Sequence, residues 1–256
     1  GLPEMDFWLT DSFLHPKNTR EFFTEKLYRL PNFYQFNAPD DFPKVSVPPV
    51  KETGFITFGS FNKPEKINDV VIKLWAKILN EVPGSRLLMK YGAYFNDPIL
   101  VDYWQDKFSQ FGVDNDCLIF NDQNTDRISH LKTYSHIDIA LDPFPFNGAT
   151  TTFEALAMGV PVITLAGNSF VSRVGGSLLK NLNLDNLIAD TQEEYVRLAR
   201  NLAFDVDTTE KLRKSLRSTL SNSDLCQGKA YTQTVEAAYR NMWTKWCVSF
   251  KRKKSK

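Results

Sequence analysis

The stretch DIALDPFPFNGATTTFEALAMGVPVITLAG, from Asp138 to Gly167, decides the fold class of this 256-residue chain. Its residues predict a strand over Ile137–Pro143, a helix over Thr151–Met158 and a second strand over Val160–Ala166. The second strand is a continuous apolar run, which is typical of a strand buried on both faces of a parallel sheet. Two such strands joined by a helix predict a right-handed βαβ unit.

The same alternation continues on both sides of this stretch. Further strands are predicted over Gly54–Phe61, Arg86–Tyr91, Cys117–Asn121 and Leu187–Ala189. Helices are predicted after a cap at Asn68 and over Leu100–Phe111, Asp126–Tyr134, Val171–Leu182, Glu193–Ala203, Thr208–Leu220 and Lys229–Trp246. The pattern predicts an α/β fold, a Rossmann-like doubly wound parallel sheet followed by C-terminal helices. In such folds ligands bind beyond the carboxyl ends of the strands.

The two ends of the chain differ from this pattern. Met5–Thr10 predicts a strand, Thr19–Leu30 has the apolar spacing of a helix, and a Pro-rich stretch up to residue 50 predicts an irregular linker. Residues 51–247 form the predicted main domain, and residues 248–256 a basic, disordered tail. Because the first residue is Gly1 rather than Met, we expect a processed or truncated chain.

Composition and charge exclude several classes of protein. Hydrophobic residues make up 42% and charged residues 24%, which is typical of a globular protein. The last six residues hold five basic ones, so the preceding 250 residues carry 26 basic and 30 acidic ones, a net charge of −4. We therefore expect no nucleic-acid partner, and without a long apolar run we expect no membrane span. Three scattered cysteines predict reduced thiols in a cytoplasmic compartment, and no residues have metal-ligand spacing.

The loop that precedes the Thr151–Met158 helix is the first candidate binding site. Asn147 and Gly148 allow the backbone to approach a ligand, and Thr150, Thr151 and Thr152 are expected to cap the helix. Free N–H groups and the positive end of the helix dipole suit a diphosphate. The alternative is simply a capped helix after a tight turn. Glu154, one turn inside the helix, predicts a ribose contact, or else a first-turn glutamate favoured by the dipole.

Two other strand ends carry cationic candidates. Lys63 and Lys66 follow the Gly54–Phe61 strand and are candidates for a phosphate contact, or else solvated loop lysines. Arg127 and His130 lie three residues apart on a short predicted helix and therefore share one face. The His130 ring is a candidate for stacking on a base, and the alternative is a structural histidine.

Taken in order, these segments resemble the O-GlcNAc transferase family, including its Spindly-type protein O-fucosyltransferases. The matching blocks are MDFWLTD (Met5–Asp11), EKLYRLP (Glu25–Pro31), GFITFGSFNKPEKIN (Gly54–Asn68), LWAKILNEVPGSRLLMK (Leu74–Lys90), the opening stretch (Asp138–Gly167), SRVGGSLL (Ser172–Leu179) and YRNMWTKWC (Tyr239–Cys247). The resemblance implies the C-terminal lobe of a two-lobed GT-B glycosyltransferase, with residues 1–50 as the end of the N-terminal lobe. It also implies that the rest of that lobe and an array of tetratricopeptide repeats lie elsewhere in a longer protein.

The resemblance also implies roles for the candidate residues. Lys66 matches the lysine that neutralises the leaving diphosphate, His130 the histidine that packs on the base, and Arg127 a basic residue near the ribose. Thr150 and Thr151 match the threonines that hold the diphosphate. Lys63, Ala149 and Glu154 differ from the animal enzymes, which have glutamine, histidine and aspartate there.

The implied activity is inverting transfer of GlcNAc from UDP-GlcNAc to Ser or Thr hydroxyls of acceptor proteins, without a metal or other cofactor. Arg173 matches the GlcNAc-transferring branch of the family. Two alternatives stay open: a protein O-fucosyltransferase that uses GDP-fucose, and a nucleotide-sugar-binding lobe without turnover.

Overall fold

The computed structural model describes residues 1–37, 41–123 and 126–254, with side chains described up to residue 248. Its centre is a six-stranded parallel sheet in the order β5-β4-β3-β6-β7-β8. The strands are β3 (Thr57–Ser60), β4 (Arg86–Lys90), β5 (Leu118–Asn121), β6 (Ile139–Leu141), β7 (Val162–Leu165) and β8 (Ile188–Ala189). The α/β prediction is confirmed. The strand order reverses between β3 and β6, and ligands of doubly wound folds bind at that point.

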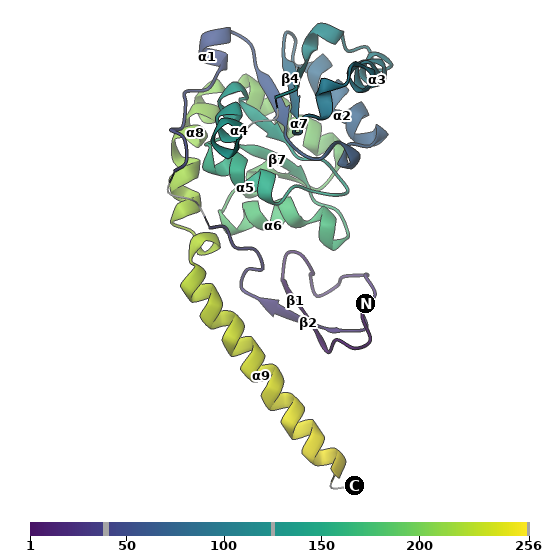
Figure 1. The fold of residues 1–256 in the computed structure, drawn as a ribbon, viewed down its shortest axis with the longest axis vertical. Helices are drawn as coiled ribbons and strands as arrows, with labels where there is room; N and C mark the ends of the chain where they lie inside the picture. The colour runs from purple at the N-terminus through teal and green to yellow at the C-terminus, as the bar shows by residue number, and fades with distance from the viewer. Residues whose placement is uncertain (38–40, 124–125, 255–256) are drawn as a thin grey trace.

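Helices connect the strands and pack against the sheet (Figure 1). They are α1 (Val50–Thr53), α2 (Asp69–Glu81), α3 (Pro98–Ser109), α4 (Arg127–Thr133), α5 (Thr150–Ala157), α6 (Val174–Asn181), α7 (Gln192–Phe204), α8 (Val206–Ser221) and α9 (Gly228–Lys254). Short 3₁₀ turns are η1 (Pro64–Lys66), η2 (Tyr94–Asn96), η3 (Asn115–Cys117), η4 (Tyr134–His136), η5 (Phe170–Ser172), η6 (Asp185–Leu187) and η7 (Asp224–Cys226). The cap at Asn68 is confirmed, because its side chain accepts the N–H groups of Val70 and Val71 at 3.0 and 3.1 Å.

The first 30 residues form a separate two-stranded parallel sheet of β1 (Phe7–Asp11) and β2 (Lys26–Leu30). The strand predicted over Met5–Thr10 is confirmed, but the helix predicted over Thr19–Leu30 is wrong. Lys26–Leu30 pairs along its whole length with β1, and Leu30 packs against Ala238 and Met242 of α9. Pairing with a distant strand therefore overrode the local helical spacing.

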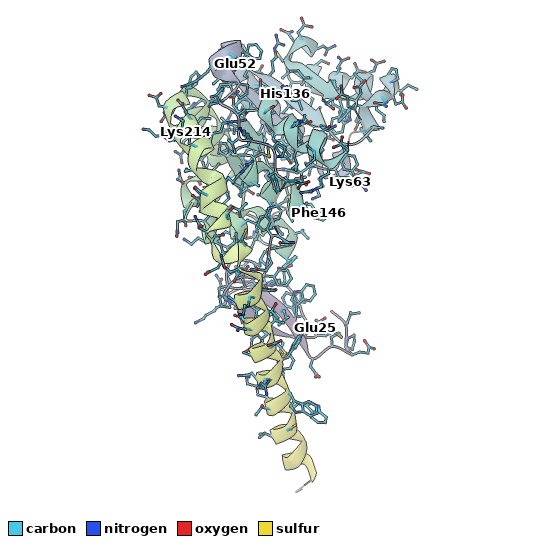
Figure 2. The ribbon with its side chains drawn as sticks, turned by 60° about the vertical axis from the view of Figure 1, so that its left-hand side comes forward. Glu25, Glu52, Lys63, His136, Phe146 and Lys214 are labelled. Carbon is cyan, nitrogen blue, oxygen red and sulfur yellow. The ribbon has the colours of Figure 1, made fainter. Side chains whose placement is uncertain are left out.

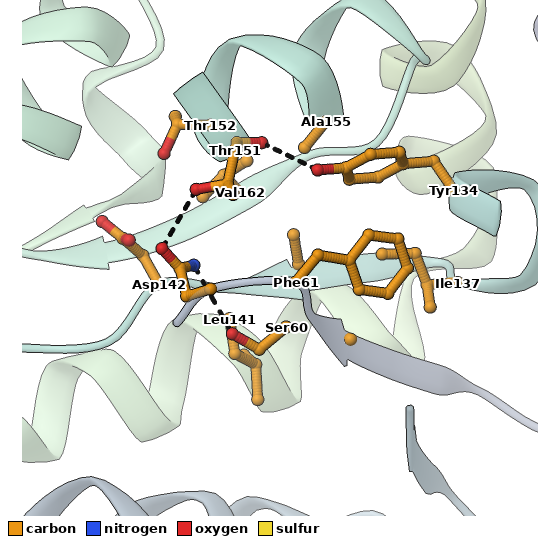
Figure 3. Close-up of a pocket in the computed structure, with 13 residues that line it drawn as sticks. Ser60, Phe61, Tyr134, Ile137, Leu141, Asp142, Thr151, Thr152, Ala155 and Val162 are labelled. Carbon is orange, nitrogen blue, oxygen red and sulfur yellow. Dashed lines mark hydrogen bonds between the residues drawn. The ribbon is translucent and has the colours of Figure 1, made fainter. Parts of the chain in front are cut away.

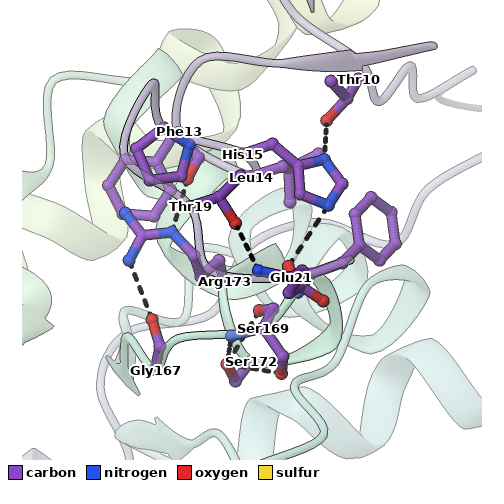
Figure 4. Close-up of polar contacts among 12 residues, drawn as sticks. Thr10, Phe13, Leu14, His15, Thr19, Glu21, Gly167, Ser169, Ser172 and Arg173 are labelled. Atoms are coloured by element: carbon purple, nitrogen blue, oxygen red, sulfur yellow. Dashed lines mark hydrogen bonds and ion pairs between the residues drawn. The ribbon is translucent and has the colours of Figure 1, made fainter. Parts of the chain in front are cut away.

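Polar contacts join this small sheet to the loop after β7 (Figure 4). Arg173 donates to the carbonyls of Phe13 and Gly167, and Glu21 accepts the N–H of Phe170 at 3.0 Å. His15 is buried, contacts Thr10 Oγ1 through Nδ1 at 2.7 Å, and lies 3.4 Å from Glu21 through Nε2. These contacts give His15 a structural environment between the small sheet and the loop after β7, where its ring stacks on Phe170 with centroids 5.4 Å apart.

In its described residues, 31–37 and 41–49, the Pro-rich linker forms no helix or strand, as expected, but buried side chains hold it in place. Arg213 of α8 is 1% exposed and donates to the carbonyl oxygen of Ser46 at 2.9 Å and to that of Ile137 at 2.8 Å. Asp138 accepts the N–H groups of Val50 and Thr57 at 3.0 and 2.8 Å. The linker is therefore fixed against the segment that leads into β6.

Helix α9 leaves the large domain as a long arm whose first half packs on β2 (Figure 1). The backbone is helical to Lys254, so residues 248–254 differ from the expected disordered tail, while residues 255–256 lie outside the described part of the chain. Within the described residues, no helix is both long enough and apolar enough to span a bilayer.

Candidate functional site

The candidate site lies where β3 and β6 end side by side. The segments that follow these two strands, residues 61–66 and 142–149, meet beneath the first turn of α5. A small cavity there is lined by side chains of both segments and of α5 (Figure 3). Across this cavity the Thr151 hydroxyl donates to Asn62 Oδ1 at 3.0 Å.

The first turn of α5 differs from the sequence prediction in one respect. Ala149, and not a threonine, occupies the N-cap position, and no side chain caps the helix. The first bond of the helix runs from Phe153 N to Ala149 O at 3.0 Å. Thr150, Thr151 and Thr152 therefore occupy the first three helical positions, whose N–H groups have no partner within a helix. Such N–H groups and the positive end of a helix dipole favour an anion, which keeps this helix start a candidate site.

Asp142 shapes the loop that leads to this helix, and the sequence analysis did not identify it. It is 1% exposed and accepts the N–H of Gly148 at 2.6 Å and the Thr164 hydroxyl at 2.7 Å. Burial raises the pKa of this carboxyl to about 7, although its hydrogen bonds and the positive charge of Lys66 oppose the shift. The signal was an acidic residue directly after an apolar strand, at the carboxyl edge of the sheet.

Asn147 joins the loop to its neighbours. Its side chain donates to Pro143 O at 3.0 Å and accepts the Gly175 N–H at 3.3 Å, while its own N–H donates to Val171 O at 3.0 Å. Gly148 has no room for a side chain, because a Cβ would lie 2.5 Å from Thr151 Oγ1 and 2.9 Å from Thr152 Oγ1. Both residues are thus needed for the loop to approach α5 closely.

Only one of the two candidate lysines reaches this loop. Lys66 donates from Nζ to Asn147 O at 2.9 Å and lies 4.2 Å from the centre of the Phe146 ring. Partial burial lowers the pKa of Lys66, and the attraction of Asp142 opposes that change. Lys63 is exposed and pairs with Glu65 at 3.1 Å, on the side of the domain where Phe146 also projects (Figure 2).

His130 and Glu154 come together on the other side of the α5 start. His130 Nε2 lies 3.3 Å from Glu154 Oε2, and the Tyr134 hydroxyl donates to the same oxygen at 3.3 Å. The His130 ring also contacts Phe61 edge-on, with centroids 5.9 Å apart. Arg127 instead pairs with Asp41 at 3.2 Å. The structure therefore brings His130 and Glu154 together but engages Arg127 with the linker.

Metal binding was not expected from the sequence. Within residues 1–37, 41–123 and 126–254, no three His, Cys, Asp or Glu side chains gather closely enough to hold a metal ion. The metal-free chemistry of the site stays a prediction.

Comparisons with known proteins show the family of the chain. Residues 50–235 match the model of glycosyl transferase family 41. The chain is 41% identical over 251 residues to a probable UDP-N-acetylglucosamine–peptide N-acetylglucosaminyltransferase SPINDLY from Hordeum vulgare, covering 96% of this chain and 26% of that protein. The chain thus spans about a quarter of the length of this relative.

Solved structures give the same result. A mutant of the Thermobaculum terrenum O-GlcNAc transferase superposes with a TM-score of 0.86 at 37% identity, over 94% of this chain and 46% of that one. Sucrose-phosphate synthase from Thermosynechococcus elongatus shares the fold at a TM-score of 0.54 and 16% identity, over 93% and 58% of the two chains. The Rossmann-like sheet is therefore that of GT-B glycosyltransferases, and the chain belongs to glycosyl transferase family 41.

Proposed function

We propose that this chain is the nucleotide-sugar-binding lobe of a protein O-glycosyltransferase. The observation that carries the proposal is that α5 starts without a side-chain cap next to a lysine. Lys66 Nζ donates to the carbonyl of Asn147, in the loop that leads into α5. A cation bonded to the loop and three N–H groups at the helix start that follows it suit a diphosphate. The names of the family relatives support a sugar nucleotide as the ligand that contains this diphosphate.

The proposed reaction is inverting transfer of GlcNAc to a Ser or Thr hydroxyl. The acceptor oxygen forms a bond to the anomeric carbon as the bond from that carbon to the diphosphate breaks, and the hydroxyl proton is released. Negative charge grows on the departing diphosphate. Lys66 and the N–H groups of Thr150–Thr152 stabilise that charge without a metal or other cofactor, as preorganised donors do in many enzymes.

The proposed donor is UDP-GlcNAc, with its diphosphate over Asn147–Thr152. The uracil lies against His130 and the ribose beside Glu154, while Arg127 reaches the ribose after it leaves Asp41. GDP-fucose is the second candidate donor, because the sequence blocks also resemble the Spindly-type protein O-fucosyltransferases. Isothermal titration of the chain with UDP and with GDP tests the choice. UDP heat at micromolar concentration supports GlcNAc transfer, and GDP heat without UDP heat supports fucose transfer.

The longer protein is proposed to act in the cytoplasm on Ser and Thr residues of other proteins. Its missing N-terminal lobe would complete the cleft, and tetratricopeptide repeats would present the acceptors. A radiolabelled donor incubated with the longer protein and a Ser/Thr peptide tests this step. Donor binding without label transfer would instead support a non-catalytic nucleotide-sugar-binding lobe.

A further inference from the structure

Asp142 lies directly behind the proposed diphosphate site and is held from three directions. Its two carboxylate oxygens accept the Gly148 N–H at 2.6 Å and the Thr164 hydroxyl at 2.7 Å. Its backbone carbonyl accepts the Tyr195 hydroxyl of α7 at 3.0 Å, and Tyr195 in turn accepts Trp75 Nε1 at 3.0 Å. The core of the domain therefore fixes the position of this carboxyl, whether or not a ligand is bound.

The surroundings of the carboxyl contain few compensating charges. Lys66 on η1 and Tyr195 on α7 are the titratable groups that face it, while β7 presents the neutral Thr164. On the side of α6 there is only the backbone of Gly175, where a Cβ would lie 2.4 Å from Asp142 Oδ2. The ion pairs among the described residues do not include Asp142, so Lys66 attracts its carboxylate from beyond ion-pair distance.

Burial raises the pKa of Asp142 to about 7, so the neutral form of its carboxyl is accessible near neutral pH in the free protein. A diphosphate at the start of α5 brings negative charge close to this carboxyl and draws Lys66 towards itself. Both effects make the ionised form of Asp142 less favourable.

The loop can keep its shape when Asp142 gains a proton. A hydroxyl group can donate or accept, so a protonated Oδ2 donates to Thr164 Oγ1 in place of accepting from it. Oδ1 continues to accept the N–H of Gly148, and the start of α5 stays where it is. A change of charge at Asp142 therefore requires no movement of the backbone.

We propose that Asp142 is a positioning residue that takes up a proton from solvent when a nucleoside-diphosphate sugar binds, and returns the proton when the diphosphate leaves. In the neutral state Asp142 still holds Gly148, but it no longer competes with the diphosphate for the charge of Lys66. The inference rests on the proposed function, since it assigns the anion at α5 to a sugar nucleotide.

The test is calorimetric titration of the 256-residue chain with UDP-GlcNAc, and in parallel with GDP-fucose, in buffers of different ionisation enthalpy. The diphosphate of a sugar nucleotide has no proton that titrates near neutral pH, so protons taken up come from the protein. We expect proton uptake near pH 7.5, and an affinity that falls by about tenfold between pH 6 and pH 8.5 as Asp142 ionises in the empty site.

Asp142→Asn is the matched variant, because its amide keeps both hydrogen bonds without a charge. We expect it to bind the donor as tightly as wild type does at low pH, with no pH dependence and no proton uptake. His130→Asn weakens binding but retains the proton uptake, which excludes the His130–Glu154 pair as its source. Infrared difference spectroscopy tests the same step in the wild-type chain, without any variant. On donor binding the spectrum should gain a carboxylic-acid band.

Equal proton uptake by wild type and Asp142→Asn would overturn the inference. So would the absence of the carboxylic-acid band, or a loss of donor affinity in Asp142→Asn at every pH. Absence of binding heat with either sugar nucleotide would instead overturn the proposed function, and the two failures are thus distinguishable.

Discussion

At the scale of single residues, Lys66 is the cation that the fold holds beside the start of α5. Its ammonium group bonds to Asn147 O, and partial burial separates it from bulk water. Charge stabilisation is stronger in such a place than in solvent. A lysine that stabilises charge developing on a leaving group acts mainly on the transition state, so its loss should appear in kcat.

We expect Lys66→Ala to lower kcat of the intact enzyme by roughly 100- to 1,000-fold, the range for removal of one such donor. Steady-state kinetics with a peptide acceptor measure the change. Lys63→Ala is the matched control, because Lys63 is exposed and paired with Glu65, and such pairs contribute little. A raised KM with unchanged kcat in Lys66→Ala would mean that Lys66 only binds the ground state.

At the scale of elements, the approach of the loop to α5 depends on Gly148. A methyl group there would meet hydroxyl oxygens of two threonines at 2.5 and 2.9 Å, so Gly148→Ala should displace the first turn of the helix. We expect donor affinity to fall by about tenfold or more, because a loss of only about 1.4 kcal/mol of binding free energy lowers affinity tenfold. Titration calorimetry measures it.

Gly228→Ala provides the control for this substitution, because a Cβ at Gly228 would have no atom within 4 Å. Its donor affinity should equal that of wild type. Wild-type affinity in Gly148→Ala would show that the loop tolerates displacement and that the close approach is not needed for binding.

The linker supplies a second prediction at this scale. Arg213 is 1% exposed and donates to the carbonyls of Ser46, Tyr134 and Ile137. It therefore joins the linker to η4 and to the short segment between η4 and β6. Arg213→Ala removes these donors from buried carbonyls, at a cost of about 1–3 kcal/mol for each group left unpaired. We expect the free energy of unfolding in urea to fall by roughly 3 kcal/mol or more.

The exposed pair of Arg197 with Glu194 on α7 allows a control for the arginine substitution. The two side chains lie 2.7 Å apart, and Arg197 is 51% exposed. Arg197→Ala should change the free energy of unfolding by less than about 1 kcal/mol. An equal loss of unfolding free energy in Arg213→Ala and Arg197→Ala would show that the buried contacts of Arg213 add no more stability than an exposed ion pair.

At the scale of the whole molecule, the chain contains one complete sheet domain and a small sheet of β1 and β2 at its side. The proposed donor site is formed by the large domain, whereas an acceptor must approach from outside it. We expect the 256-residue chain to fold and to bind its sugar nucleotide, but to transfer no sugar by itself. Calorimetry and a radiolabel assay on the same preparation measure both properties, and steady transfer to a peptide would contradict the two-lobe arrangement.

The sequence by itself determined the features that depend on neighbouring residues. The order of strands and helices in residues 54–246, the cap at Asn68 and the position of the Thr-rich helix start all follow from local periodicity and side-chain chemistry. Lys66, His130 and Glu154 could be selected as candidates because parallel strands bring the loops that follow them to one edge of the sheet, and their roles stay predictions.

Only the tertiary structure decided the features that depend on residues far apart in the chain. Lys26–Leu30 became a strand because β1 was available to pair with it, and helical spacing contains no information about that partner. Asp142 fixes the loop before α5 because the fold places Thr164, Tyr195 and Gly148 within hydrogen-bond distance of it. Hydrogen bonds to a buried group depend on which elements the topology places beside it, and one segment of sequence does not specify its neighbours.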